Sequence, residues 1–251
     1  MEKKDLYNYI LGIADNPLIL GQRLGELCGH GPSLETDIAC TNIALDLFGQ
    51  TRSYFQYAAK IKGENATEDS IAFLRTEREY TNVLLVEQPN TDFAFTITRQ
   101  FLFDVYHYLF LEQLQKSKDV NLSAIAHKAI KEVSYHQRFS SDWIKRLGDG
   151  TDESKKRMQN AVNDLWRYTD ELFHTTESDE AMIAEGIGVD VKKLKNIYYS
   201  RINKILEDAR LEIPESKWFQ KGGKHGLHTE YMGYILSEMQ YMQRTYPNMT
   251  W

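Results

Sequence analysis

The sequence is poor in cysteine and proline and has no long hydrophobic run. The two cysteines, Cys28 and Cys40, are too few for a disulfide framework, and we interpret both as small buried apolar side chains. No apolar stretch reaches the ~18 residues that a membrane-spanning helix needs, so we expect no membrane segment. The first residues, MEKKDLYNYI, lack the apolar core of a signal peptide, and we expect a cytoplasmic protein.

Clusters of positive charge are missing as well. The 251 residues include 30 Lys+Arg against 36 Asp+Glu, for a formal net charge of −6, and no basic block stands out. Because a nucleic-acid groove needs a clustered basic face, we expect no nucleic-acid partner. The chain is 42% hydrophobic and 26% charged, as ordinary globular proteins are, and its length suits one domain spanning residues 1–251.

Helical periodicity is what the sequence does contain. Proline is rare, strand-like alternation is scarce, and long stretches repeat apolar residues every three or four positions. The predicted fold class is all-α. Four long helices of similar length, joined by short or medium links, are typical of an up-down bundle. Their expected ranges are 4–28, 33–62, 92–116 and 122–147.

Local signals set the boundaries of these helices. Ser33 is a good N-cap for the second helix and Gly63 ends it, while the turn at residues 88–90 precedes the third. Pro17 either kinks the first helix or follows a cap at residues 15–16 that opens another helix, and both alternatives are open. Further helices are expected at 70–80, 152–175, 179–185, 190–209 and 227–242.

One pair of side chains points to metal chemistry. Asp104 and His107 are three apart in the third long helix, which puts them on one face, and His136 lies on the next helix. A di-iron carboxylate centre takes a Glu from each of two helices and a Glu-x-x-His pair from each of the other two. Asp104-x-x-His107 is the one match of this type in the four long helices. Glu132 and His136 are four apart, so a complete ligand set is not found.

A resemblance to a known family rests on four segments, GQRLGELCGHGPSLETDIACTNIALDLFGQTR, LLVEQPN, KAIKEVSYHQRFS and GLHTEYMGYILSEMQYMQR. They are similar to the non-catalytic structural subunit, called PaaC, of bacterial multicomponent phenylacetyl-CoA epoxidases. The resemblance runs from about residue 6 to Trp251. It implies a ferritin-like four-helix bundle with additional C-terminal helices, related to the catalytic di-iron subunit of the same complexes.

Through this resemblance, the ligand positions of that catalytic relative map onto the first two helices. The relative has Asp-Glu-x-Gly-His-x-Gln in its second helix, and the matching stretch here begins at Asp46. The ligand Glu then falls on Leu47 and the ligand His on Gln50. The Glu of the first helix falls on Gln22.

The third and fourth helices keep only part of the ligand set. The third-helix carboxylate is retained as Asp104, whereas the Glu-x-x-His of the fourth helix falls on Val133 and His136. Leucine and valine have no lone pair to bridge two irons, so the resemblance implies no metal and no cofactor in this chain. A polar cluster is expected instead, with a protonated His136 beside Asp104. Its members would be Gln22, Gln50, Asp104 and His136.

The function that the resemblance implies is structural. The chain would bind and stabilise a di-iron catalytic subunit that epoxidises phenylacetyl-CoA in phenylacetate catabolism, with NADPH electrons supplied by a flavin and iron–sulfur reductase. The aromatic residues, 12% of the chain, suit a large partner interface. The sequence leaves open whether the isolated chain is a homodimer, which face meets the partner, and whether another aryl-acyl-CoA is the substrate.

Two other functions are weighed against this one. The chain could be an oxygenase with an unusual metal site built from Asp104, His107, Glu132 and His136. It could also be an acyl-CoA helper that offers the backbone N–H groups and two lysines of residues 221–226 to a phosphate. The candidate interface or CoA-phosphate contacts are Glu87, Gln88, Pro89, Asn90, Lys221, Lys224 and His228.

Overall fold

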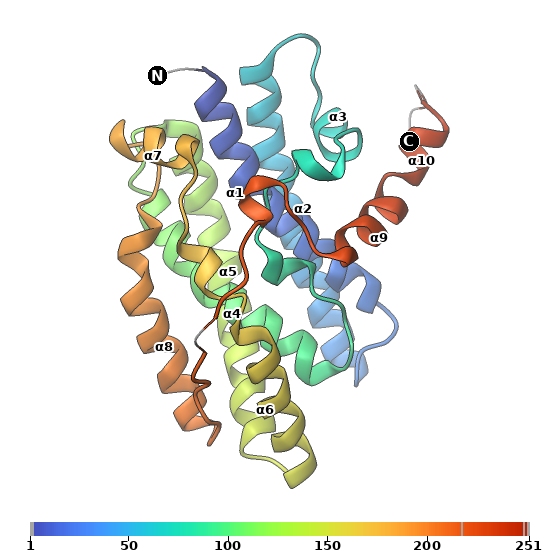
Figure 1. Ribbon diagram of the computed structural model, residues 1–251. Helices are drawn as coiled ribbons and strands as arrows, with labels where there is room; N and C mark the ends of the chain where they lie inside the picture. Colours follow the sequence, from blue (N-terminus) through green and yellow to red (C-terminus); the bar gives the residue numbers. More distant parts are fainter. Residues whose placement is uncertain (1–2, 217, 248, 250–251) are drawn as a thin grey trace.

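The computed structural model describes residues 3–216, 218–247 and 249 of the chain, and the regular structure in these residues is entirely helical (Figure 1). The all-α fold class is therefore confirmed. None of the helices in this part of the chain is both long and apolar enough to cross a membrane.

Four long helices form the bundle that the sequence predicts. Helix α1 (Lys3–Leu27) packs along α2 (Leu34–Lys62), and α4 (Phe93–Leu114) packs along α5 (Val120–Gly148). Contacts between α2 and α5 join the two pairs. The expected caps are used: Ser33 begins α2, and Gly63 ends it with a φ of 69°. Asp92, where the third helix was expected to start, is the N-cap of α4.

Pro17 does not divide the first helix. α1 continues through it, and the two residues before it serve another purpose than capping a new helix. The carboxylate of Asp15 binds Arg75, with an Oδ2–Nη1 distance of 3.0 Å, and Asn16 Oδ1 accepts the N–H of Val83 at 2.8 Å. The alternative of a helix cap at residues 15–16 is wrong, because both side chains hold the segment that follows the second helix.

The rest of the chain is helical but more interrupted than predicted. The helix expected at 152–175 ends at Trp166, because the chain must turn there for Glu171 to reach its buried partners. The helix expected at 227–242 starts at Glu230 and is divided at Gln240, whose side chain bonds to Arg75 O. The one expected at 70–80 is also divided. The elements of this part are α3 (Glu68–Phe73), η1 (Glu77–Glu79), η2 (Leu84–Glu87), α6 (Asp152–Trp166), η3 (Asp170–Phe173), α7 (Glu177–Ala184), η4 (Val191–Leu194), α8 (Lys195–Asp208), η5 (Gly223–His225), α9 (Glu230–Met239) and α10 (Tyr241–Thr245).

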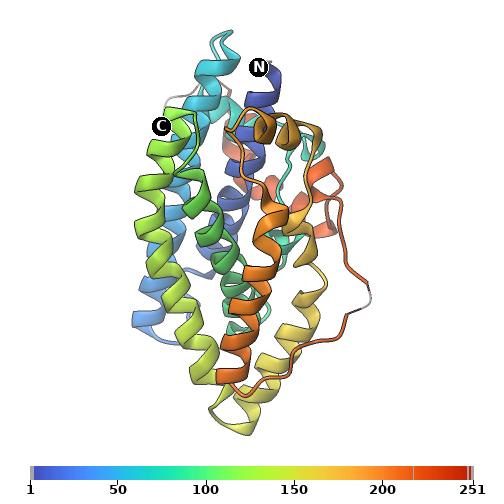
Figure 2. The same ribbon diagram turned by 90° about the vertical axis from the view of Figure 1, so that its left-hand side faces the viewer.

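The buried apolar side chains form one continuous cluster that takes residues from α1 to α9. After α8 the chain runs along the outside of the bundle without regular structure and then returns to α1, against which α9 packs (Figure 2). Segments from the start, the middle and the end of the sequence therefore meet beside α1. Buried polar side chains, Glu87 and Glu171 above all, hold these segments together.

Candidate functional site

Apolar side chains fill the two positions at which the family resemblance led us to expect the counterparts of bridging carboxylates. Leu47 on α2 and Val133 on α5 are both fully buried, at 0% exposure, and belong to the hydrophobic core. Two iron ions in a low-dielectric core need anionic bridges, and these side chains supply none. No group of three or more His, Cys, Asp and Glu side chains in the described residues could hold a metal ion. The donor set does not fit a di-iron centre.

Asp104, the retained carboxylate, is bonded to neutral partners. Its Oδ1 accepts a hydrogen bond from Gln100 Nε2 at 2.7 Å, and its Oδ2 accepts one from Ser140 Oγ at 2.8 Å. Burial raises the pKa of Asp104 to about 7, although the nearby His136 and both hydrogen bonds act to lower it. Near neutral pH, this group therefore supplies only part of a negative charge.

His136 and Gln50 each bond to an acidic residue on the facing helix. His136 is fully buried on α5, and its Nε2 lies 3.0 Å from Oδ2 of Asp46 on α2. Gln50, also on α2, donates from Nε2 to Oε2 of Glu132 on α5 at 2.9 Å. Two polar contacts thus link the α2 and α5 helices where the ligand positions lie.

The polar cluster predicted from the sequence is distributed over separate contacts. Within the described residues, no hydrogen bond joins any two of Gln22, Gln50, Asp104 and His136. Asp104 has Ser140 as its partner on α5, where we expected His136. The sequence reasoning missed the partners of these groups. Helical spacing could have found one of them, because Gln100 and Asp104 are four apart on α4, whereas the partners on other helices leave no local signal.

The four residues of the alternative metal site are likewise in contact with separate partners. Glu132 is engaged by Gln50, His136 by Asp46, and Asp104 by Gln100 and Ser140. His107 lines a different cavity and packs on Phe103, with ring centroids 5.1 Å apart. The members proposed for this site were Asp104, His107, Glu132 and His136, and the structure does not bring them together around one point.

Glu87 shows that the turn at residues 87–90 is a packing element. Its side chain is fully buried, and its Oε1 accepts from Asn82 Nδ2 at 2.9 Å and lies 2.6 Å from Nδ1 of His228. Its Oε2 accepts from the N–H and the hydroxyl of Thr229, at 2.8 and 2.6 Å. A carboxylate with four partners supplied by two distant segments is a structural anchor.

His228 is the charged partner of this anchor. Its Nε2 lies 2.9 Å from the carbonyl oxygen of Tyr80, which can only accept, while its Nδ1 faces Glu87. Both ring nitrogens therefore carry protons. Burial by itself would lower the pKa of His228, but the hydrogen bond and the charge of Glu87 raise it above its ordinary value.

Two arginines fix the main chain of the same turn. Arg23 donates from Nε and Nη2 to the carbonyl of Glu87, at 2.9 and 2.8 Å. Arg99, which is fully buried, donates to the carbonyl of Gln88 and, at 2.8 Å, to Oδ1 of Asn90. Burial, together with Arg23, lowers the pKa of Arg99 to about 9. The turn is held from inside, which argues against a role as an exposed contact.

The glycine loop at residues 221–226 is occupied by the protein itself. Glu171 Oε1 accepts the N–H groups of Gly222 and Gly223, at 2.7 and 2.8 Å, and its Oε2 accepts the N–H of Leu84 at 2.7 Å. Lys224 donates from Nζ to the carbonyl of His174 at 2.6 Å. The phosphate site suggested for Lys221 and Lys224 is not supported, because the Glu171 carboxylate already accepts the backbone N–H groups that a phosphate would need.

We predict that Asp104→Asn flattens the dependence of stability on pH. The carboxyl is protonated in the folded chain up to a pH of about 7 but ionises near 4 when unfolded. Wild-type stability should therefore fall between about pH 4 and about pH 7, by at most about 4 kcal/mol. Urea unfolding across this range measures the difference. Asp142→Asn, at an exposed position of α5, is the control, and a profile for Asp104→Asn that parallels the wild type would contradict the prediction.

We also predict that Glu87→Gln lowers the free energy of unfolding by about 3 kcal/mol, because it leaves the His228 imidazolium buried without its counter-charge. In the wild type, the pair stabilises fully below about pH 6.5, and this stabilisation is lost as pH rises through the raised pKa of His228. The Glu87→Gln variant should not show this pH-dependent loss of stability. Thermal and urea unfolding measure both effects, and Glu238→Gln on the exposed face of α9 should change neither.

Comparisons with known proteins identify the family of this chain. The family model described as phenylacetic acid catabolic protein matches residues 1–251. One of the subunits of the 1,2-phenylacetyl-CoA epoxidase of Escherichia coli (strain K12) is 49% identical over 243 residues, which cover 97% of this chain and 98% of the relative. By the extent of both matches, this chain is a member of the phenylacetic acid catabolic protein family.

Proposed function

We propose that this chain is a non-catalytic assembly subunit of a phenylacetyl-CoA epoxidase complex. In this proposal it binds the di-iron catalytic subunit, stabilises it, and carries no cofactor of its own, while a separate reductase delivers electrons to the partner. The observation that carries the proposal is the burial of Leu47 and Val133 where bridging carboxylates would be needed. The name of the E. coli relative supports the complex and its substrate.

The side chains that remain near these positions are suited to packing rather than to redox chemistry. Asp104 is held by two neutral donors, and burial keeps its pKa near 7. His136 and Gln50 are each committed to a carboxylate on the neighbouring helix. These contacts hold α2 against α5, so they preserve the shape of a bundle without retaining its metal ligands. A catalytic subunit that docks on this chain requires a bundle of stable shape.

The outer face of α2 is the surface that we assign to the partner. Leu34, Ile38 and Leu45 share this face by helical spacing, and they are 72%, 50% and 60% exposed. Tyr135 of α5 is 41% exposed, and it lines an open groove of about 540 Å³ between the start of α2 and α5. Exposed apolar patches of this kind mark protein interfaces. The groove is also lined by Phe139, Trp143, Arg138, Arg146, Glu35 and Asp142.

We predict that Ile38→Asp weakens binding to the catalytic subunit at least tenfold, because it places a charge in the apolar part of the interface. Co-expression of the two subunits followed by co-purification and affinity measurement tests this. Ile197→Asp on α8, where the native side chain is 43% exposed, is the matched control and should bind normally. Helix α8 is separated from α2 by α4 and α5 (Figure 2). Equal binding by the two variants would exclude the α2 face.

We predict that the purified chain, loaded anaerobically with ferrous iron, retains well under one iron per chain and consumes no oxygen. The physical reason is the lack of anionic bridges at Leu47 and Val133. Metal analysis after gel filtration and an oxygen electrode provide the measurements. Close to two irons per chain with oxygen consumption would contradict the non-catalytic role, whatever the result with Ile38→Asp.

A further inference from the structure

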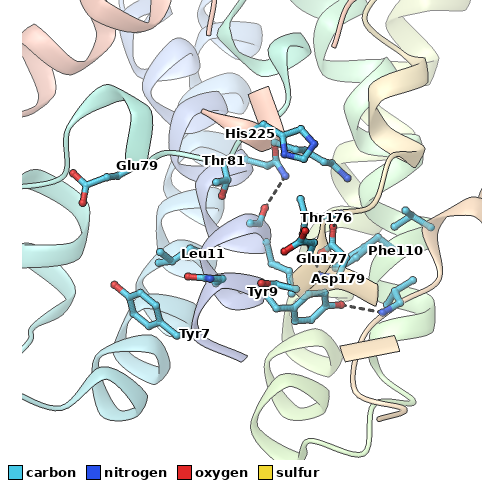
Figure 3. Close-up of a pocket in the computed structure, with 18 of the residues that line it drawn as sticks. Tyr7, Tyr9, Leu11, Glu79, Thr81, Phe110, Thr176, Glu177, Asp179 and His225 are labelled. Atoms are coloured by element: carbon cyan, nitrogen blue, oxygen red, sulfur yellow. Dashed lines mark hydrogen bonds between the residues drawn. The ribbon is translucent and has the colours of Figure 1, made fainter. Parts of the chain in front are cut away.

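A large cavity lies away from the α2–α5 face. Its volume is about 690 Å³, and it is lined by α1, the end of α2, α4, the beginning of α7, and the segments 75–81, 189–191 and 224–225 (Figure 3). Pockets that bind small organic ligands have volumes in this range. Its walls come from seven separate parts of the sequence, so the cavity exists only in the folded chain.

The inner wall of the cavity is aromatic. Phe103, Tyr106 and Phe110 follow one another along α4, with ring centroids 6.1 Å apart for the first pair and 5.9 Å for the second. Tyr9 of α1 lies on the same cavity, with its hydroxyl held by the N–H of Val189 at 2.9 Å. Aromatic rings prefer edge-to-face or offset contacts with other rings. This wall is therefore better suited to an aromatic ligand than to an aliphatic one.

His107 contributes a polar group to that aromatic wall. It is 4% exposed, and its Nδ1 is buried with no hydrogen-bond partner in the described residues. An atom that no solvent probe reaches is closed to a ligand as well, so the ring nitrogen that can meet a ligand in the cavity is Nε2, for which no hydrogen bond is found in the described residues. Burial, reinforced by the charge of His136, lowers the pKa of His107 to about 3. The ring is neutral, and it offers one donor and one acceptor.

The charges around the cavity leave no excess of either sign. Arg75 is neutralised by buried Asp15. The cations and anions that remain on the wall are equal in number: Lys62, Arg78 and Lys224 against Glu79, Glu177 and Asp179. A balanced rim gives no advantage to a strongly charged ligand.

We propose that this cavity binds a small neutral aromatic molecule with one hydrogen-bonding group, the ring against Phe103, Tyr106 and Phe110 and the polar group at His107. The chemical class is that of phenols and aryl alcohols. This binding is a second property of the chain, separate from its role in assembly. The test of ligand binding can therefore succeed or fail whether or not the chain binds the catalytic subunit.

The experiment measures binding of phenol, toluene and cyclohexanol to the full chain by titration calorimetry. Gly12→Leu fills the cavity, since a Cβ at Gly12 would have Thr81 Oγ1 as its neighbour, at 3.8 Å. Gly25→Leu is the matched control on the same helix, because a Cβ there meets nothing within 4 Å. His107→Phe removes the polar group but keeps an apolar ring. Thermal unfolding confirms that each variant is folded.

We expect saturable binding of one phenol per chain, weaker binding of cyclohexanol, and at least a tenfold loss in Gly12→Leu with none in Gly25→Leu. Phenol should bind to His107→Phe roughly three- to tenfold more weakly than to the wild type, as expected for one lost hydrogen bond. Toluene, which has no polar group, should bind to both equally well. No saturable binding of phenol by the wild type would overturn the proposal. So would equal binding of phenol and cyclohexanol, or unchanged binding in Gly12→Leu.

Discussion

The buried carboxylate of Glu87 is the interaction on which the connection between distant parts of this chain depends. A carboxylate without solvent is strongly unfavourable unless its oxygens are fully bonded, and here they have four partners from residues 82, 228 and 229. Glu171 follows the same rule with the N–H groups of Leu84, Gly222 and Gly223. Through these two side chains, the middle and the end of the sequence are fixed to one another beside α1.

The long helices were predictable because their signals are local. An N-cap serine at 33, a glycine at 63 and an aspartate at 92 lie within one turn of the boundaries that they set. The interrupted elements after α5 were not predictable in the same way. The helix expected at 152–175 ends at Trp166, because the burial of Glu171 against three N–H groups decides the backbone there. Those donors come from segments remote in the sequence.

The expected metal-ligand positions likewise include features that the sequence predicts and features that only the structure reveals. Position by position, the family resemblance places Leu47 and Val133 at the former bridging sites, and the structure shows both fully buried. The partners of Asp104 and His136 depend on how α2, α4 and α5 are rotated against one another, which the sequence pattern alone does not specify. The turn at residues 87–90 belongs to one of the segments that carry the family resemblance, so the sequence alone marks it as distinctive. Its inward orientation, with Arg99 completely buried behind it, became visible only in three dimensions.

The anchoring of residues 222–229 has a consequence for how the chain is made. The ribosome releases the chain from its N-terminal end first, so Glu87 and Glu171 are synthesised long before the residues that satisfy them. Until the last segment emerges, neither carboxylate has its full set of donors, and the region beside α1 cannot close. We expect the nascent chain to keep this side open to water until residues 222–229 have left the ribosome.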